Sequence, residues 1–235
     1  MNFRSLVPPL LAATLWMAGC PTIQPGPERH ESRAVERDAA ERVKAILNMG
    51  AGRLTVRGGA RKLMEAEFAY STPFGRPEVT YRSTGALGTL TLDQPASSGP
   101  HAGNSKCEWD LALNNEVPLD LSAHFGAGEA RLDLGDLTLR NVEVHMGVGR
   151  LELDLRGHPK GDFAVQIEGG VGEANVRLPL EAGLEVRARG GLGAIHVRGL
   201  RQEEGRWVND ARRDGAANIR VDIRGGIGAI NVTAE

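Results

Sequence analysis

Short runs of alternating apolar and polar residues, each interrupted by closely spaced glycines, recur along most of the chain. Before one glycine pair, Leu121, Ala123 and Phe125 share one parity, with polar residues mostly between them. After that pair, Ala130 and Leu132 continue the alternation. This pattern is typical of strands that bury one face. No segment shows a long helical period, so the pattern predicts an all-β fold.

One sequence motif within this pattern, the repeated phrase, occurs seven times. Each copy has a small residue, a glycine two residues later, and then strict apolar alternation, at residues 49–56, 85–92, 125–132, 146–153, 169–176, 190–197 and 225–232. Successive copies lie 36, 40, 21, 23, 21 and 35 residues apart. A period in the twenties is typical of repeat proteins, whose units bury their apolar faces by stacking. We therefore predict a stacked-strand, β-solenoid-like domain. A β-sandwich is the alternative, because strand spacing alone also fits that class.

Each repeat is predicted to be a strand, a glycine corner and a second strand. Glycine tolerates positive φ and close backbone approach, which a sharp corner needs. The predicted corner glycines are Gly50, Gly52, Gly126, Gly128, Gly147, Gly149, Gly170, Gly172, Gly191, Gly193, Gly226 and Gly228.

The polar positions support parallel stacking in register. Such stacking would bring together the outward residues Glu129, Arg150 and Glu173, the pair Arg131 and Glu152, and the pair Asp154 and Arg177. Opposite charges on adjacent strands contribute about 0.2–1 kcal/mol per pair. These charges are therefore predicted to be structural.

The N-terminus carries a predicted lipoprotein signal over residues 1–19. Residues 6–16 are apolar but too short to span a bilayer, and Ala18 and Gly19 precede Cys20 as in a bacterial lipobox. We expect cleavage before Cys20 and lipidation of that residue. The protein would then be anchored to a membrane of the bacterial envelope, facing the periplasm or the exterior.

The remaining chain divides into predicted segments by composition. Residues 20–31 form a tether, 32–94 the N-terminal β repeats with a strand running from 32 into the first corner, 95–106 a loop, 107–235 the C-terminal repeats and 200–217 a charged insertion. The insertion explains the long interval before the last repeat.

Charge and cysteine content exclude some classes of function. The net charge is −2, and the chain has no dense basic patch, so no nucleic-acid partner is expected. Only Cys107 would remain as a free thiol after processing. It shares its parity with Trp109, which predicts a buried hydrophobic position for both rather than a reactive role.

Few residues offer catalytic or cofactor chemistry. His124, His145 and Glu168 share one outward offset in successive repeats and are weak candidates for a metal site, although exposed polar residues are normal there. Asp133 and Asp154 are the pair a glycan-cleaving enzyme would use, yet Arg177 accounts for Asp154 without catalysis. The glycine pairs lack the third glycine and helix of a dinucleotide loop. We expect no cofactor and no catalysis.

The last repeat and the insertion are candidates for partner contact. The final strand contains Ile230 and is predicted to be the exposed edge of the stack. Trp207, within the insertion, is predicted either to cap that end or to anchor a partner. Strand addition at this edge would give a dimer or a complex.

Residues 47–60, 63–68 and 77–81 resemble the toast-rack domain of bacterial envelope proteins. The later repeats resemble the related C-terminal domain of membrane proteins that respond to cell-wall-active antibiotics. Together these resemblances cover residues 40–235 and imply a stacked all-β domain outside the cytoplasmic membrane, without established catalytic residues. The antibiotic-response proteins have transmembrane helices before this domain, where this chain has a lipoprotein signal.

The sequence thus favours a lipid-anchored, non-catalytic β-repeat protein that presents a surface to an envelope protein or to itself. Envelope stress response is one setting for it. The alternative is a carbohydrate-active enzyme or glycan-binding protein on the same scaffold.

Overall fold

The computed structural model describes residues 27–71, 74–96, 106–213 and 217–235, and it is almost entirely β. The elements in chain order are β1 (Glu28–Val35), β2 (Arg42–Gly58), β3 (Met64–Ser71), β4 (Glu78–Thr84), β5 (Leu87–Asp93), β6 (Cys107–Leu113), β7 (Leu119–Asp133), β8 (Leu139–Asp154), β9 (Phe163–Leu178), β10 (Gly183–Arg198), β11 (Arg201–Glu203), β12 (Arg206–Val208), the 3₁₀ helix η2 (Asp210–Arg213) and β13 (Asn218–Ala234). No described helix is long and apolar enough to cross a membrane.

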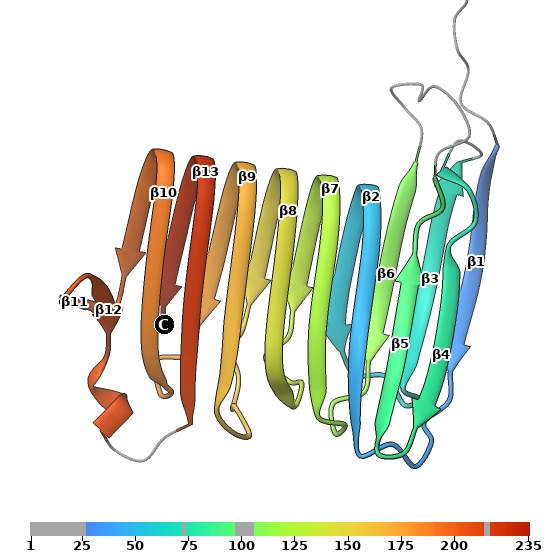
Figure 1. The fold of residues 1–235 in the computed structure, drawn as a ribbon, viewed down its shortest axis with the longest axis horizontal. Coiled ribbons are helices and arrows are strands. Elements are labelled where there is room, and N and C mark those ends of the chain that lie inside the picture. The colour runs from blue at the N-terminus through green and yellow to red at the C-terminus, as the bar shows by residue number, and fades with distance from the viewer. Residues whose placement is uncertain (1–26, 72–73, 97–105, 214–216) are drawn as a thin grey trace, which may run out of the picture.

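Six long strands form the body of the molecule: β2, β7, β8, β9, β13 and β10. Each rises on one face, bends at its glycine pair and descends on the other face (Figure 1). We call each bent strand a rung and its two halves the first and second limbs. Neighbouring rungs are parallel and in register through both limbs. The predicted stacked-strand fold is therefore confirmed.

The core lies between the two faces. Alternate residues of each limb point inward, and these are buried before the corner, as at Leu121, and after it, as at Leu132 and Leu151. Intervening residues such as Arg131 face outward. The strict apolar alternation along the sequence thus corresponds to the two inner faces of one core.

The two faces separate at the N-terminal end of the stack. On one face, β5 pairs with the first limb of β2 and with β4. On the other face, β6 pairs with the second limb of β2, and β3 and β1 follow it. This end is therefore closed by two short sheets rather than by bent strands.

The second copy of the repeated phrase is not a corner, which corrects the prediction of seven equivalent units. Gly85 lies in the turn of the β4–β5 hairpin with a φ of 60°. Tyr81 on β4 packs over Gly88. This copy of the repeated phrase therefore forms a tight hairpin turn, because a glycine with positive φ fits both a hairpin turn and a corner between limbs.

Two strands occupy the region that was expected to hold a tether and one continuous strand. β1 begins at Glu28, inside the segment predicted as tether, and pairs antiparallel with β3. Between β1 and β2, the Asp38 carboxylate accepts hydrogen bonds from the Ala40 N–H at 2.9 Å and from the Tyr81 hydroxyl at 2.7 Å. This local turn separates the two strands.

The last strand in sequence is not the last in space. β13 lies between β9 and β10, so Ile230 pairs with Ala174 on one side and Ile195 on the other, and it is buried. The prediction that Ile230 lies on the exposed edge is therefore wrong. The insertion before β13 gives the chain enough length to double back, and the edge strand is β10.

The insertion covers the lower part of that edge. β12 pairs with β10 at Glu185 and Val186, and Trp207 packs partly buried against the core. The Asn209 side chain accepts a hydrogen bond from the Leu184 N–H at 2.8 Å and donates to the carbonyls of Leu180 and Ala182. Trp207 is thus part of a partial cap, one of its two predicted roles.

Three of the predicted charge pairs form on the outer faces, whereas Glu129, opposite Arg150 in the register, contacts Arg53 at 3.4 Å. Arg131 lies 2.7 Å from Glu152, Arg150 lies 3.4 Å from Glu173, and Arg177 lies 3.8 Å from Asp154. These rungs are direct neighbours in the sheet, which confirms the predicted register.

Cys107 and Trp109 are core residues. Both are buried, and the Trp109 ring meets Phe68 edge-on with the centroids 5.6 Å apart. Burial raises the pKa of the Cys107 thiol to about 12. A thiol that stays protonated is a poor nucleophile, which agrees with the predicted packing role.

Candidate functional site

The corners are places where backbones meet directly. Gly149 has a φ of 145°, and a Cβ atom there would overlap the carbonyl oxygen of Gly128 on the neighbouring rung. At Gly147 the overlap would be with the carbonyl of Gly126. Both positions therefore need glycine because the neighbouring backbone lies so close, and Gly149 needs it also for its positive φ. The other predicted corner glycines lie at the same two positions of their rungs.

The first corner is supported by a side chain in place of a neighbouring rung. The Gln94 side-chain oxygen accepts hydrogen bonds from the N–H groups of Gly50 and Ala51 at 2.7 and 3.1 Å. Among the residues that the structure describes, no hydrogen bond of this kind supports the β10 corner at the opposite end.

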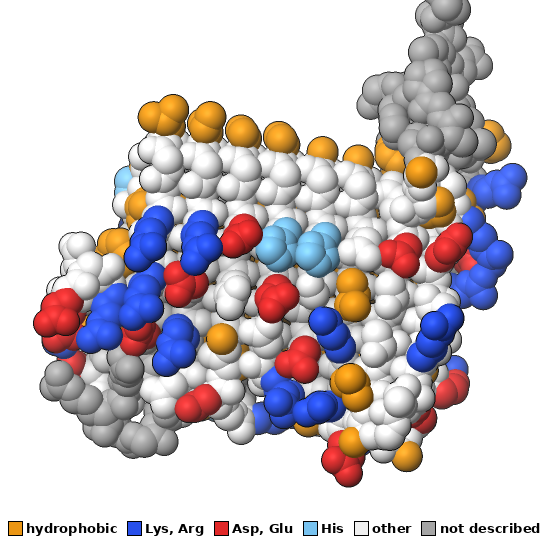
Figure 2. Space-filling view, in the orientation of Figure 1, with side chains coloured by type: hydrophobic (Ala, Val, Ile, Leu, Met, Phe, Trp, Pro, Cys, Tyr) orange, Lys and Arg blue, Asp and Glu red, His pale blue; other side chains and the backbone are white. Residues whose placement is uncertain are grey.

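A row of polar side chains crosses one face just below the corners. In spatial order it consists of Asp93, Asn48, His124, His145, Glu168, Arg224 and Arg189. Figure 2 shows the two histidines side by side in the middle of this face, followed by an acidic and then basic side chains toward β10. The row therefore carries one carboxylate at its N-terminal end, a second at Glu168 beyond the histidines, and two arginines at the β10 end.

The predicted metal candidates do come together, but they do not converge. The rings of His124 and His145 are stacked, with centroids 4.7 Å apart and planes only 3° from parallel. Ring lone pairs lie in the ring plane, so parallel stacked rings direct them side by side rather than at one point. The described residues include no group of three or more ligating side chains that could hold a metal.

Hydrogen bonds and charge account for the three residues instead. His124 Nε2 lies 2.9 Å from the Ser122 hydroxyl, His145 Nδ1 lies 3.4 Å from Glu168, and Glu168 lies 3.4 Å from Arg224. Partial burial and the neighbouring His145 ring lower the pKa of His124. The row therefore forms a chain of side-chain contacts between rungs.

The candidate carboxylates Asp133 and Asp154 lie opposite one another on β7 and β8, but the surroundings of Asp154 oppose acid catalysis. Arg156 contacts Asp154 at 2.6 Å, and Arg177 adds a second positive charge. Partial burial alone would raise the pKa of Asp154, but the hydrogen bonds and charge of Arg156 outweigh it and hold the pKa below its usual value. A glycosidase acid needs a raised pKa. Asp154 is therefore unsuited to that role.

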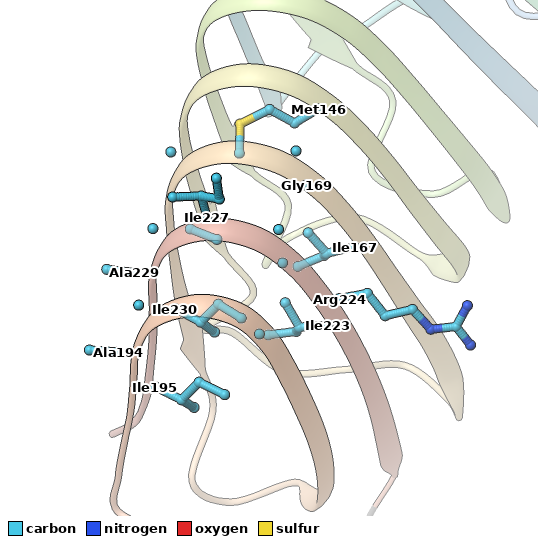
Figure 3. Close-up of a pocket in the computed structure, with 18 residues that line it drawn as sticks. Met146, Ile167, Gly169, Ala194, Ile195, Ile223, Arg224, Ile227, Ala229 and Ile230 are labelled. Carbon is cyan, nitrogen blue, oxygen red and sulfur yellow. The ribbon is translucent and has the colours of Figure 1, made fainter.

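A narrow apolar cavity lies under the last three corners. Figure 3 shows Ile167, Ile195, Ile223 and Ile230 around it, while the Arg224 side chain points away. The inner position just before the corner is Met49, Phe125 or Met146 in β2, β7 and β8, but Gly169, Gly225 or Gly190 in β9, β13 and β10.

Neighbouring side chains already occupy much of this space. A Cβ atom added at Gly225 would lie 3.1 Å from Ile230 Cδ1, and one at Gly169 would lie 3.4 Å from Met146 Cε. Ligand pockets usually add polar groups that orient the ligand. The cavity is therefore a packing feature of the corner.

The open surface of β10 was not anticipated from the sequence. β10 pairs with β13 along almost its whole length, but on its other side, within the described part of the chain, only Glu185 and Val186 pair with β12. Leu192 and Ile195 are 70% and 38% exposed. The insertion at 200–217 was the one available signal, because it gives the chain enough length to return past β10.

Comparison with known proteins identifies the family. The family described as the N-terminal domain of toast_rack (DUF2154) matches residues 24–177. The chain belongs to this toast-rack family.

One solved structure shares its architecture along nearly the whole chain. A "putative cell adhesion protein" from Clostridium sporogenes is 35% identical over 90% of this chain and 100% of its own, with a TM-score of 0.85. A "putative adhesin" from Bacteroides fragilis is 13% identical over 88% of this chain and 97% of its own, with a TM-score of 0.33. A search of curated proteins gives no match.

Proposed function

We propose that this toast-rack protein is a lipid-anchored, non-catalytic module of the bacterial envelope that binds a protein partner, or a second copy of itself, by strand addition. The uncovered side of β10 is the observation that carries this proposal. An unpaired edge offers a row of N–H and C=O groups to another strand.

The second limb of β10 is the better docking segment. Its outward residues include Ala194 and His196, whereas the first limb presents Arg187 and Arg189. Charged side chains on an edge strand discourage pairing, so the second limb is the less protected half. Its inner residue Ile195 is partly exposed and would be covered by an added strand.

The Clostridium sporogenes structure supports a binding role. That protein is described as a putative cell adhesion protein, and its whole length matches this chain. Adhesion requires a binding surface and no catalytic step. The lipid on Cys20 would hold the domain at the membrane, and envelope stress response is one setting in which such a partner would act.

Paired proline substitutions test the edge. Successive N–H groups of a strand point to opposite neighbours in the sheet. Of the variants Ala194→Pro and Ile195→Pro, one therefore removes an N–H on the open side of β10, and the other removes an N–H that bonds to β13. We expect one variant to keep the thermal stability of the parent and lose association in sedimentation or pull-down. The other should lose stability. Association that persists in the stable variant would place the interface elsewhere.

A further inference from the structure

One unbroken apolar row runs along the corners. It consists of the residue between the two glycines of each corner, in spatial order Ala51, Ala127, Val148, Val171, Ile227 and Leu192. We call this row the corner ridge. Figure 2 shows it along the upper rim of the molecule. At about 4.8 Å per strand, its five steps span roughly 24 Å.

The corner ridge is both exposed and contiguous. Val148, Val171, Ile227 and Leu192 are 55%, 44%, 53% and 70% exposed, and they make up four of the six exposed large hydrophobic side chains among the described residues. The glycines on both sides have no side chains that could cover them. Single exposed apolar residues are ordinary, but an aligned set indicates a contact surface.

The ridge changes in character from one end to the other. It begins with alanines at β2 and β7, continues with valines and ends with Ile227 and Leu192. At this bulkier end, Ala229 and Ala194 follow the corner on one face, while Arg224 and Arg189 lie just before it on the other face. Apolar side chains bordered by arginines suit an anionic lipid surface, because guanidinium groups bind phosphates well.

The chain also enters the fold at the level of the corners. Arg29 on β1 pairs with Tyr70, Tyr70 pairs with Cys107, and the Cys107 carbonyl lies directly against Gly52. Figure 1 shows β1 beginning at the same side of the molecule as the bends. Eight residue steps separate Cys20 from Glu28, and a chain of this length spans at most about 29 Å. A lipid on Cys20 would therefore keep the ridge close to the bilayer.

We propose that the corner ridge docks on an anionic bilayer, so that the rungs stand on the membrane with their corners toward it. Val148, Val171, Ile227 and Leu192 reach the boundary between headgroups and acyl chains, and the exposed Arg189 contacts lipid phosphates. This proposal rests on the lipid anchor of the proposed function, which supplies the attachment, while the ridge sets the orientation.

A fluorescent probe in the lipidated chain tests the orientation. The mature protein is reconstituted into vesicles of phosphatidylethanolamine and phosphatidylglycerol, with an environment-sensitive label on Leu192→Cys. The matched control is Leu180→Cys, because Leu180 is 46% exposed and lies in the connection after β9, at the end opposite the corners. Buried Cys107 remains unlabelled in the folded protein.

We expect nitroxide lipids to quench the label at position 192 several-fold more than the label at position 180. The charge reversal Arg189→Glu should weaken quenching at position 192 on anionic vesicles and not on neutral ones. Equal quenching at both positions, on chains that float with the vesicles, would overturn the proposal.

Failure of the lipid anchor gives a different result. Chains that do not float with the vesicles would contradict lipidation at Cys20. The same labelled chains, attached by an N-terminal histidine tag to nickel-chelating lipids, then decide the ridge alone. Selective quenching at position 192 supports docking, and its absence refutes it.

Discussion

At the scale of single residues, the corner glycines link backbone geometry to stacking. The second glycine of a corner, such as Gly149, both has a positive φ and lies against a carbonyl of the neighbouring rung. A side chain there would strain its own rung and push the next one away. The exposed charge beside it, Arg150, contributes little, because solvent screens the pair with Glu173.

Gly149→Val should therefore destabilise the protein far more than Arg150→Ala. Backbone strain and overpacking against Gly128 each contribute about 1–3 kcal/mol, so we expect a loss of about 2–6 kcal/mol. Arg150→Ala should cost about 0.5 kcal/mol or less. Urea unfolding of both variants measures the difference, and equal midpoints would show that the neighbouring rung can move aside.

At the scale of elements, outward charges help to specify the register between rungs. Arg131 and Glu152 lie on adjacent strands, and their other neighbours in the same row, Thr55 and Asn175, are uncharged. This pair is thus isolated enough for a charge exchange. A one-residue slip of β7 against β8 would also turn apolar residues outward, so the charges add to a register that burial already favours.

Arg131→Glu alone should destabilise the protein by about 0.5–1 kcal/mol, because it replaces an attraction by a repulsion. The exchange Arg131→Glu with Glu152→Arg should recover most of that loss. Thermal unfolding at low and high salt measures both effects, and the deficit of the single variant should shrink in high salt. A double variant no more stable than the single one would mean that the pair does not couple the two rungs.

The sequence was sufficient to predict the rungs but not their order. Alternation identified inner and outer positions, and the charge pairs gave the register from β7 to β9. The position of β13 was missed because its corner has the same arrangement, two glycines around one apolar residue, as every other corner and would suit any place in the stack. The hairpin at Gly85 was missed because a glycine turn and a glycine corner look alike locally.

The same limit applied to the candidate site. The shared offset of His124, His145 and Glu168 correctly placed them side by side, whereas the near-parallel stacking of the two rings depends on side-chain rotation that no spacing reveals. The open side of β10 follows from strand order, so it could not be predicted before the position of β13 was known.

At the scale of the whole molecule, the two proposed surfaces are compatible. The corner ridge runs along the tops of the rungs, and the open edge of β10 lies at one end of the stack. A two-fold axis perpendicular to the membrane would keep both ridges facing it. Because this axis exchanges the two faces, it would set the second limb of β10 antiparallel to the first limb of β10 in the second copy, above the Glu185–Val186 segment that β12 covers. Lipid anchoring and strand addition can therefore act together.

The position of β13 leads to a prediction about the entire C-terminal end. Asn175 on β9 and His196 on β10 both pair with Asn231, from opposite sides, so two strand steps of about 9.6 Å in total separate them. A disulfide requires Cα atoms less than about 7 Å apart. The double variant Asn175→Cys with His196→Cys should therefore form no disulfide in the full chain.

A chain ending at residue 217 lacks β13 and should behave differently. β9 and β10 carry the same corner glycines and inward apolar positions in the same register, so β10 can dock directly on β9. One strand step of about 4.8 Å would then separate the two cysteines, and the disulfide should form under mild oxidation. Mass spectrometry of peptides from both chains measures the link. If the shortened chain forms none, β10 requires β13 for its place in the stack, and the rungs are less interchangeable than their shared corners imply.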